Sequence, residues 1–294
     1  MSTNVRSGRA HGKSFGIRMP DVTVDTLLNT PTIAVRDVCC LGTCKHKSES
    51  ECATATQLVF PYRGVYMRHV GSDNAIADAN QVLFFNAGQE YQVSHPVIGG
   101  DACLSISIDA PLLLELMPAE LLETRQRPSF KRQQQRIDPR AQALVALLRH
   151  SLRNGAIETL EAETLMFTLV RRAMGLNAKF TSSASHGHRK LVERTKLVLA
   201  SDLSRRWTLA EIAAETGGSP VYLTQVFQQV EGMPLYKYQM QLRLARALDL
   251  LHQYDDLSAL GLDLGFSSHS HFSAAFRQAF GSSPSAFKQS AAQC

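Results

Sequence analysis

The 294-residue sequence has no long hydrophobic run. Its most apolar stretches, such as residues 111–118, fall well short of the roughly 20 residues that a membrane-spanning helix needs. The basic N-terminus also lacks the apolar core and the small-residue cleavage site of a signal peptide. We therefore expect a cytoplasmic protein without a membrane partner, and we expect residues 1–25 to form a disordered basic tail.

Charge is also scarce, because only 19% of the residues are charged while 44% are hydrophobic. This composition argues against a disordered chain and favours a folded protein of about two domains. The net charge of +5 permits an anionic partner but does not require one. From Lys190 onward, ten Lys and Arg residues stand against nine Asp and Glu residues, so little of the positive charge lies in the C-terminal third. An anionic partner of that region would be recognised by a few well-placed side chains.

The six cysteines include no C-x-x-C pair, although four of them fall between Cys39 and Cys52. A disulfide scaffold is not expected in a chain of this length without an export signal. We expect reduced thiols, which leaves metal binding, redox or electrophile reactivity, or simple burial as a small hydrophobe.

Apolar residues alternate with polar ones over residues 33–108, and turn residues separate the runs. This period-two pattern predicts short strands of a small antiparallel barrel or sandwich. The expected strands cover residues 33–38, 57–62, 64–70, 81–85, 91–95 and 103–108.

Apolar residues then recur every three or four positions, which predicts amphipathic helices over residues 139–154 and 157–174. Between residues 177 and 187 the composition changes to Ser, Ala, Thr and Gly, which is typical of a linker, and we place the linker at residues 179–188. The expected fold class is α+β: a β-domain with helices over residues 26–178, followed by an all-α domain over residues 189–294.

The C-terminal segment contains the start and stop signals of two short helices. Thr208 and Glu211 have the spacing of a capping box, and a Gly-Gly pair ends the first helix. Ser219 and Pro220 supply the N-cap and the first residue of the next helix. Two short helices joined by a tight glycine-containing turn form a helix-turn-helix.

The same arrangement occurs again over residues 256–287, with a turn at Gly265-Phe266-Ser267. Between the two copies, residues 234–251 predict one long helix, which spans roughly 27 Å at about 1.5 Å per residue. A spacer of this order can hold two recognition helices about one DNA turn, ~34 Å, apart on the same face of a duplex.

Together these motifs resemble the DNA-binding domain of the AraC/XylS family of transcriptional regulators. The family's features occur in order at Glu211-Ile212-Ala213, Ser219 to Phe227, Gly232 with Pro234, Arg243 to Leu251, Gly265 to Phe276 and Gly281 to Phe287. The resemblance covers residues 190–290, about a third of the chain. It implies a sequence-specific DNA-binding transcription regulator, an activator and not an enzyme, that contacts double-stranded DNA and RNA polymerase.

The resemblance also implies roles for individual residues. Those expected to face bases in two successive major grooves are Val221, Thr224, Gln225, His269, Ser270, Ser273 and Ala274. Those expected at phosphates are Lys237, Arg243, Arg277 and Lys288. Where the family often has Arg, this sequence has Gln225 and Ala274, and Ala can contact only a thymine methyl. We therefore expect base readout that relies more on DNA shape and on water.

Gly261 lies in the middle of a predicted helix where the family typically has Ala. Glycine in a helix interior costs up to about 1 kcal/mol relative to alanine. We therefore expect the second helix-turn-helix to be the more labile of the two.

The N-terminal half resembles, in architecture, the cupin-like effector and dimerisation domain of the same family. It implies a homodimer and an unidentified small effector. Candidate sensor or metal ligands are Cys39, Cys44, His46, Cys52, His95 and Cys103.

The segment VSHPVIGGDAC is typical of a hairpin. If its turn is centred on Gly99, His95 stands opposite Cys103, and the pair could bind Zn²⁺ or lower the pKa of the thiol. Cys39 and Cys40 would point to opposite faces of a strand, so they cannot both serve one site. A metal or thiol sensor, plain packing and a pocket for an organic effector all remain open.

Two other functional classes fit less well. A metal-dependent cupin enzyme needs clustered ligands, whereas His46, Glu49, His69, Glu90 and His95 are scattered and the β-region has no His-x-His. An Ada-like methyl-acceptor regulator would use the C-x₃-C spacing of a cysteine pair at 40 and 44, but the downstream C-x-x-C is missing.

Overall fold

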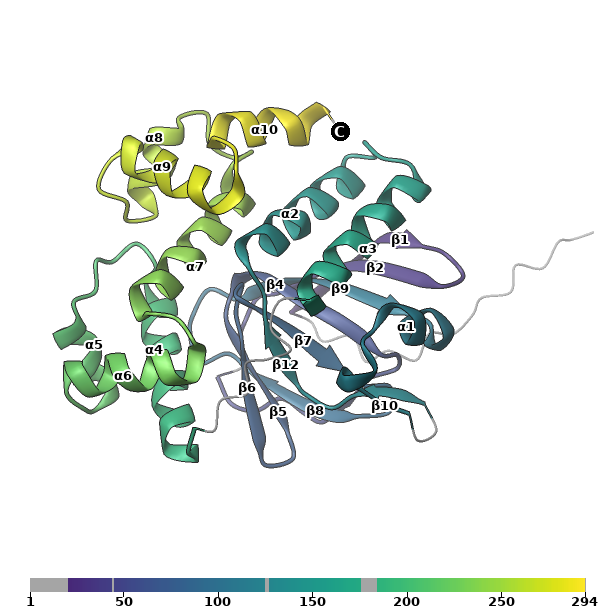
Figure 1. Cartoon of the computed structure of the whole chain (residues 1–294), viewed down its shortest axis with the longest axis horizontal. Coiled ribbons are helices and arrows are strands. Elements are labelled where there is room, and N and C mark those ends of the chain that lie inside the picture. The colour runs from purple at the N-terminus through teal and green to yellow at the C-terminus, as the bar shows by residue number, and fades with distance from the viewer. Residues whose placement is uncertain (1–20, 44, 125–126, 176–183, 294) are drawn as a thin grey trace, which may run out of the picture.

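The structure, a computed structural model, describes residues 21–43, 45–124, 127–175 and 184–293 (Figure 1). Its fold class is α+β, as predicted: antiparallel sheets form the N-terminal half, and only helices follow from residue 186 onward in the described chain. No described helix is long and apolar enough to cross a membrane.

The described strands form two larger antiparallel sheets and one small hairpin. The six-stranded sheet has the order β1-β2-β9-β4-β7-β12, the four-stranded sheet has the order β3-β8-β5-β6, and β10 pairs with β11. The strands are β1 (Val22–Asn29), β2 (Ile33–Cys40), β3 (Glu51–Cys52), β4 (Gln57–Gly64), β5 (Tyr66–Val70), β6 (Asp73–Ala77), β7 (Gln81–Phe85), β8 (Glu90–Ser94), β9 (Asp101–Ile108), β10 (Leu122–Thr124), β11 (Pro128–Phe130) and β12 (Gln134–Arg136).

Helices follow the last long strand and then make up the whole C-terminal region. A 3₁₀ turn, η1 (Ala119–Leu121), separates the first helix from the second. The helices are α1 (Ala110–Leu116), α2 (Pro139–Arg153), α3 (Thr159–Gly175), α4 (His186–Ser201), α5 (Leu209–Thr216), α6 (Pro220–Glu231), α7 (Leu235–Leu250), α8 (Leu257–Asp263), α9 (His269–Phe280) and α10 (Pro284–Gln293).

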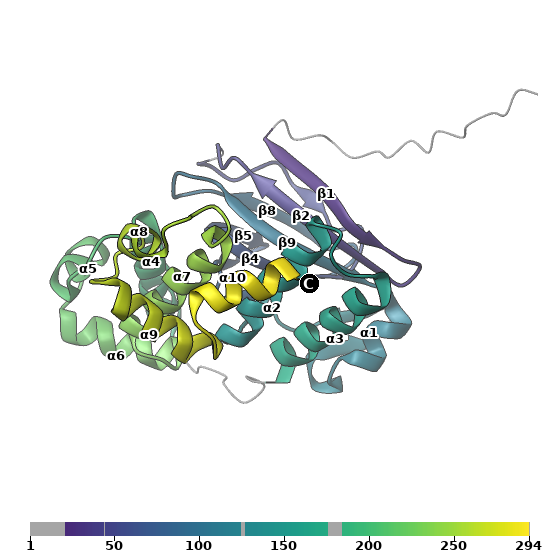
Figure 2. The same cartoon turned by 90° about the horizontal axis from the view of Figure 1, so that it is seen from above.

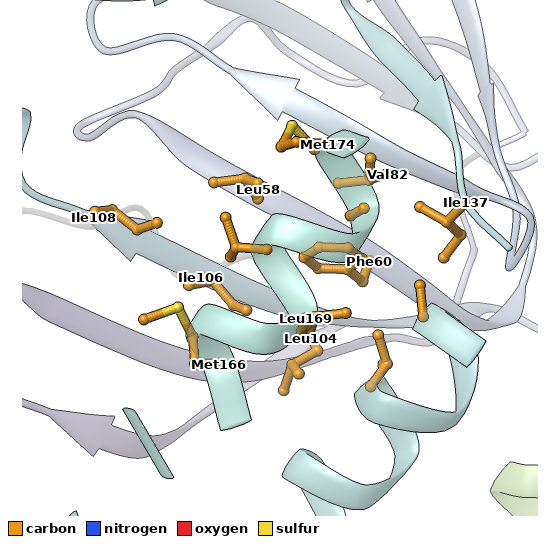
Figure 3. Packing of buried hydrophobic residues seen from close by; sticks show 14 of the residues in the cluster. Leu58, Phe60, Val82, Leu104, Ile106, Ile108, Ile137, Met166, Leu169 and Met174 are labelled. Atoms are coloured by element: carbon orange, nitrogen blue, oxygen red, sulfur yellow. The ribbon is translucent and has the colours of Figure 1, made fainter. Parts of the chain in front are cut away.

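One face of the six-stranded sheet is covered by α2 and α3. Side chains alternate across each strand, so every second residue of β4 and β9 points toward these helices. The resulting hydrophobic cluster includes Leu58, Phe60, Leu104, Ile106, Met166 and Leu169 (Figure 3). Burying one such side chain contributes about 1.5–3 kcal/mol, so this cluster is a main source of stability of the N-terminal half.

The opposite face of the six-stranded sheet packs on the four-stranded sheet. Cys103 of β9 points to this side and joins a cluster with Val59, Tyr66, Leu83 and Phe85. The N-terminal half therefore has three layers, in the order helices, six-stranded sheet, four-stranded sheet.

The helical region has two hydrophobic clusters, one for each helix-turn-helix. Leu223 and Phe227 of α6 belong to the first cluster, and Phe272 and Phe276 of α9 belong to the second. Helix α7 contributes to both clusters, since its N-terminal half packs with the first and its C-terminal half with the second. This helix therefore joins the two units, as its place in Figure 1 shows.

Two predicted boundaries were wrong. Strand β1 begins at Val22, so residues 22–25 belong to the sheet and not to a tail. Helix α4 begins at His186, because the Ser185 side chain accepts a hydrogen bond from the backbone N–H of His188. Residues 186–188 are therefore helical and not part of the linker, while residues 1–20 and 179–183 lie outside the described residues.

The hairpin predicted around Gly99 was also wrong. Strand β8 pairs with β3 and β5, whereas β9 pairs with β2 and β4, so the two strands belong to different sheets. Gly99 and Gly100 both have positive φ, at 117° and 67°, and carry the chain from one sheet to the other. His95 and Cys103 are consequently not a cross-strand pair.

Candidate nucleic-acid interface and cysteine cluster

The first helix-turn-helix is built from α5 and α6 by local capping. Thr208 and Glu211 form the predicted capping box, and Ser219 caps α6 ahead of Pro220. The inward face of α6 buries Leu223 and Phe227. The opposite face presents Val221 and Gln225, which are exposed, and Thr224, which is half-buried and donates its hydroxyl to the Val221 carbonyl at 2.8 Å.

The second helix-turn-helix consists of α8 and α9. Ser268 caps α9 by accepting a hydrogen bond from the backbone N–H of His271 at 3.1 Å. Opposite the buried phenylalanines, the side chains expected to face bases are again accessible: His269, Ser270 and Ala274 are exposed and Ser273 is half-buried. The Ser273 hydroxyl lies 3.2 Å from His269 Nε2.

The helices that carry these residues, α6 and α9, lie along the same side of the helical region (Figure 2). Helix α7 connects the two units with 16 residues, about 24 Å at 1.5 Å per residue. This length is of the order needed to place two helices in successive major grooves.

The four residues expected at phosphates differ in exposure and fall into three kinds. Lys237 and Arg277 are exposed. Lys288 is half-buried and donates to the Tyr254 carbonyl at 2.7 Å. Arg243 is buried, so it does not present a guanidinium to a phosphate in this arrangement.

Arg243 instead ties the two units together. From α7 its guanidinium donates to the carbonyls of Leu203, Arg205 and Gly265, at 2.7, 2.8 and 3.2 Å. The first two carbonyls lie ahead of α5 and the third lies in the turn before α9. The prediction that Arg243 contacts a phosphate is therefore corrected. Its guanidinium already donates to backbone carbonyls in a buried site, so it does not offer a pair of N–H groups to an anion.

The helical region also docks on the N-terminal half through buried polar groups. Tyr238 of α7 donates its hydroxyl to Asp78 at 2.6 Å. Within the helical region, Lys196 of α4 forms an ion pair with Glu231 of α6 at 2.7 Å, near enough to Asp78 for their charges to interact. Burial raises the pKa of Asp78. Burial alone would lower the pKa of Lys196, but Glu231 and Asp78 raise it above its usual value.

A second polar contact lies further along α7. Arg149 of α2 forms an ion pair with Asp249 of α7 at 2.7 Å, and its guanidinium lies 3.9 Å from the ring centre of Tyr62. Tyr62 donates to Asp37 at 2.6 Å, which links this contact to β2. The seam holds a cavity of about 10 Å³, room for about one water molecule.

The cysteines expected to gather between residues 39 and 52 do not form one site among the described residues. Cys39 packs toward the helices, with Sγ 3.8 Å from the Tyr62 hydroxyl. Cys52 and His46 are exposed. Cys44 lies outside the described residues.

Cys40, His95 and Asp101 do come together, at the edge of the space between the two sheets. Cys40 and Asp101 are register partners on β2 and β9, and His95 follows β8 of the other sheet. His95 Nε2 and Asp101 Oδ1 are 2.7 Å apart. One ligand atom from each of the three residues lies within 4.8 Å of the other two, and this is the one potential metal-ligand group of three or more among the described residues.

Cys103 lies beside this group, with its thiol donating to Asp101 Oδ2 at 3.4 Å. Burial, together with the negative charge of Asp101, raises the pKa of the Cys103 thiol well above its usual value. The prediction that His95 would activate Cys103 was therefore wrong. The hydrogen bond with Asp101, and then the nearness of Cys40, instead raise the pKa of His95 to about 10.

The sequence of the helical region matches known proteins. The helix-turn-helix domain family matches residues 189–290. The transcriptional activator RhaR of Klebsiella pneumoniae is 33% identical over 34% of this chain and 36% of its own length. A solved regulator with an AraC-type DNA-binding domain from Chromobacterium violaceum is 30% identical over 37% of this chain and 98% of that chain, with a TM-score of 0.35. The C-terminal third of the chain is an AraC/XylS-type helix-turn-helix domain.

Outside the AraC/XylS-type domain the similarity is weak. Apo ToxT of Vibrio cholerae covers 88% of this chain and 97% of its own length, at 12% identity and a TM-score of 0.36. Similarity at this level carries no information about an effector. The chain spans about a third of the length of the curated relatives it matches, such as RhaR at 36%. These relatives are transcription regulators, which supports the prediction that the chain is not an enzyme.

The sequence predicts the AraC/XylS-type domain but does not indicate several residues of the candidate sites. The adjacency of Cys39 and Cys40 predicts that they point to opposite faces of β2, but it does not indicate which of the two belongs to a site. Asp101 carried no signal except its place next to a Gly-Gly pair. The residues that dock the AraC/XylS-type domain on the N-terminal half could not be found at all, because they meet only in the folded chain.

Proposed function

We propose that the protein is a sequence-specific DNA-binding transcription regulator, an activator, that responds to a small signal sensed by its N-terminal half. The observation that carries the proposal is the pair of capped recognition helices, α6 and α9, presented on one side and joined by α7. A duplicated helix of this kind suits two successive major grooves.

The base-reading residues in this proposal are Val221, Thr224 and Gln225 on α6, and His269, Ser270, Ser273 and Ala274 on α9. The exposed side chains among them can approach base edges without rearrangement. Gln225 suits adenine, whereas Val221 and Ala274 offer apolar contact to thymine methyl groups. Exposed Lys237 and Arg277 are the proposed phosphate contacts.

The wider role follows from relatives and remains part of the proposal. RhaR is named an activator, which supports activation through contact with RNA polymerase. We propose that the protein acts in the cytoplasm as a homodimer joined by the N-terminal half. The signal is sensed by that half, through its cysteine and histidine residues.

Polar contacts between the two halves provide a route for the signal. A ligand switches the protein only if it binds two arrangements with different affinity. The Tyr238–Asp78 and Arg149–Asp249 contacts join α7 to the N-terminal half and would differ between such arrangements.

A genome-wide footprint of bound DNA tests the function and identifies the operator. On that operator, we expect Gln225→Ala to weaken binding by about 1–3 kcal/mol and to relax specificity at one base pair. The matched control is Gln289→Ala, the same change at an exposed position of α10, which should bind as tightly as the original protein. Failure of the original protein to bind any duplex more tightly than random DNA would contradict the proposal.

A further inference from the structure

Between the two sheets of the N-terminal half, three residues of different chemistry meet away from the proposed DNA interface. We propose that Cys40, His95 and Asp101 bind a single divalent transition cation, with Zn²⁺ the best match. Their ligand atoms lie within 4.8 Å of one another. The proposed function places signal sensing at cysteine and histidine residues of this half without naming a ligand, and the cation site makes that proposal specific.

The donor set selects the kind of cation. A thiolate, an imidazole and one carboxylate suit Zn²⁺ and its neighbours, whereas Ca²⁺ and Mg²⁺ need mostly oxygen ligands. Bond lengths of about 2.0–2.3 Å in a tetrahedral zinc site place ligands about 3–4 Å apart, so small side-chain rotations would close the site. The two negative ligands would neutralise the cation, which matters because His95 and Asp101 are buried.

The backbone around the site is built for close approach. A Cβ on Gly100 would lie 2.2 Å from the Cys40 carbonyl oxygen, and a Cβ on Gly42 would lie 2.6 Å from the Gly100 Cα. Any other residue would place its Cβ too close to these backbone atoms, so only glycine allows the end of β2 to lie this close to the start of β9. The backbone N–H of Gly42 donates to Cys40 Sγ at 3.4 Å, which fixes the position of the sulfur.

His95 provides an independent observation. Its side chain is 3% exposed, and its Nδ1 has no hydrogen-bond partner. A buried polar atom without a partner is unfavourable, so an unused ring nitrogen requires an explanation. A cation would provide it, either on that nitrogen with Asp101 as the orienting partner or on Nε2 with Asp101 as a ligand.

Three residues before Cys40 on the same strand, but on its other face, Asp37 begins a series of contacts with the helical region. Asp37 of β2 accepts from Tyr62, which lies under the Arg149 guanidinium that pairs with Asp249. A regulatory effect of the cation rests on the proposed function, whereas the binding itself does not.

Zinc titration of the reduced full-length protein tests the site. We expect one Zn²⁺ per chain in competition with a chromogenic chelator, and a sulfur-to-metal absorption band when Co²⁺ replaces Zn²⁺. The variants Cys40→Ser and Asp101→Asn should weaken binding by more than about 100-fold, since even the loss of an outer-shell partner costs up to about 100-fold. Cys39→Ser is the matched control, because its thiol lies on the other face of β2 and should leave binding unchanged.

A second measurement does not depend on the variants folding. Zn²⁺ should protect Cys40 of the original protein from alkylation, while exposed Cys52 reacts at the same rate with and without the metal. Equal alkylation of Cys40 in both conditions, or equal zinc affinity of the original protein and Cys40→Ser, would overturn the proposal. Binding of one Zn²⁺ without binding of specific DNA would support the metal site and contradict the proposed function. Binding of specific DNA without binding of Zn²⁺ would support the proposed function and contradict the metal site.

Discussion

The two helix-turn-helix units have the same internal design but dock on the N-terminal half in different ways. The first unit is held by Tyr238, which donates to buried Asp78, and by the charge of Lys196 near the same carboxylate. Lys196 is paired with Glu231 of its own unit, and both side chains are at most about one-tenth exposed. The second is held at its border by Arg149 with Asp249, and by the stacked rings of His150 and His252, 3.8 Å apart. His252 is exposed and His150 half-buried.

This difference indicates which unit can move. Opening the first contact would break the buried Tyr238–Asp78 hydrogen bond and separate Asp78 from the charge of Lys196. In the second contact Asp249 is also buried, but the His150–His252 pair borders water, so this part of the contact loses less on separation. We therefore expect the first unit to stay with the N-terminal half while the second opens more readily.

The largest expected effect comes from Lys196→Met in the first contact. Removing one partner of a buried ion pair typically costs about 3–5 kcal/mol, because the other charge remains buried. Glu231 would be that charge here, with Asp78 nearby. Urea unfolding measures the loss of stability.

Lys190→Met is the matched control, because Lys190 lies on the same helix but is exposed. It should change stability by less than about 0.5 kcal/mol. Equal effects of the two variants would mean that the buried contact does not hold the first unit.

Asp249→Asn tests the contact of the second unit. We expect it to cost about 1.5–3 kcal/mol, the range for hydrogen bonds to charged groups, because Arg149 loses its charged partner. Hydrogen exchange should show faster opening of α8 and α9, with α5 and α6 unchanged. Faster exchange in both units would contradict the expectation that the second unit opens independently of the first.

Local signals made the helix-turn-helix units predictable, whereas contacts between distant segments were not. The capping box at Thr208 and the cap at Ser219 depend on residues at most three apart, and the structure confirms both. Arg243 was misassigned, because its role depends on carbonyls 22–40 positions away. The position of Cys40 opposite Asp101 likewise follows from a strand order that no local pattern encodes.

Gly261 is another position where a local sequence signal is insufficient, and it provides a test with a smaller expected change in stability. Helix propensity predicts that Gly261→Ala stabilises α8 by up to about 1 kcal/mol. In the structure, however, a Cβ at this position would lie 3.0 Å from Cβ of Phe272, a fully buried ring packed on Phe266 and Phe276. Overpacking typically costs about 1–3 kcal/mol, so we expect a net loss of about 1 kcal/mol.

The matched control for this test is Gly187→Ala in α4, where the nearest atom to an added Cβ is 3.9 Å away. That change should stabilise the protein slightly, as measured by its melting temperature. A stabilising Gly261→Ala would instead support the expectation that glycine makes the second unit labile.

The smallest expected effect is a pH dependence of the second contact. Burial, followed by the charge of Arg149, lowers the pKa of His150, and burial, followed by His150 and Lys288, lowers the pKa of His252. Neutral His150 also lies with Nε2 2.8 Å from the Asn154 amide nitrogen, a contact in which it accepts. Both histidines therefore favour the neutral form in the folded protein.

Because these folded-state pKa values lie below the unfolded value of about 6.5, the contribution of the pair is fully present above that pH and is lost as the pH falls below it. Hydrogen exchange of α9 should accelerate between pH 7 and pH 5.5 relative to α6. His252→Gln should abolish the difference, while His46→Gln, at an exposed position without a stacked partner, should preserve it. An unchanged pH response in His252→Gln would show that the stacked pair does not set the opening of the second unit, and Asp249 with Arg149 would then be its main restraint.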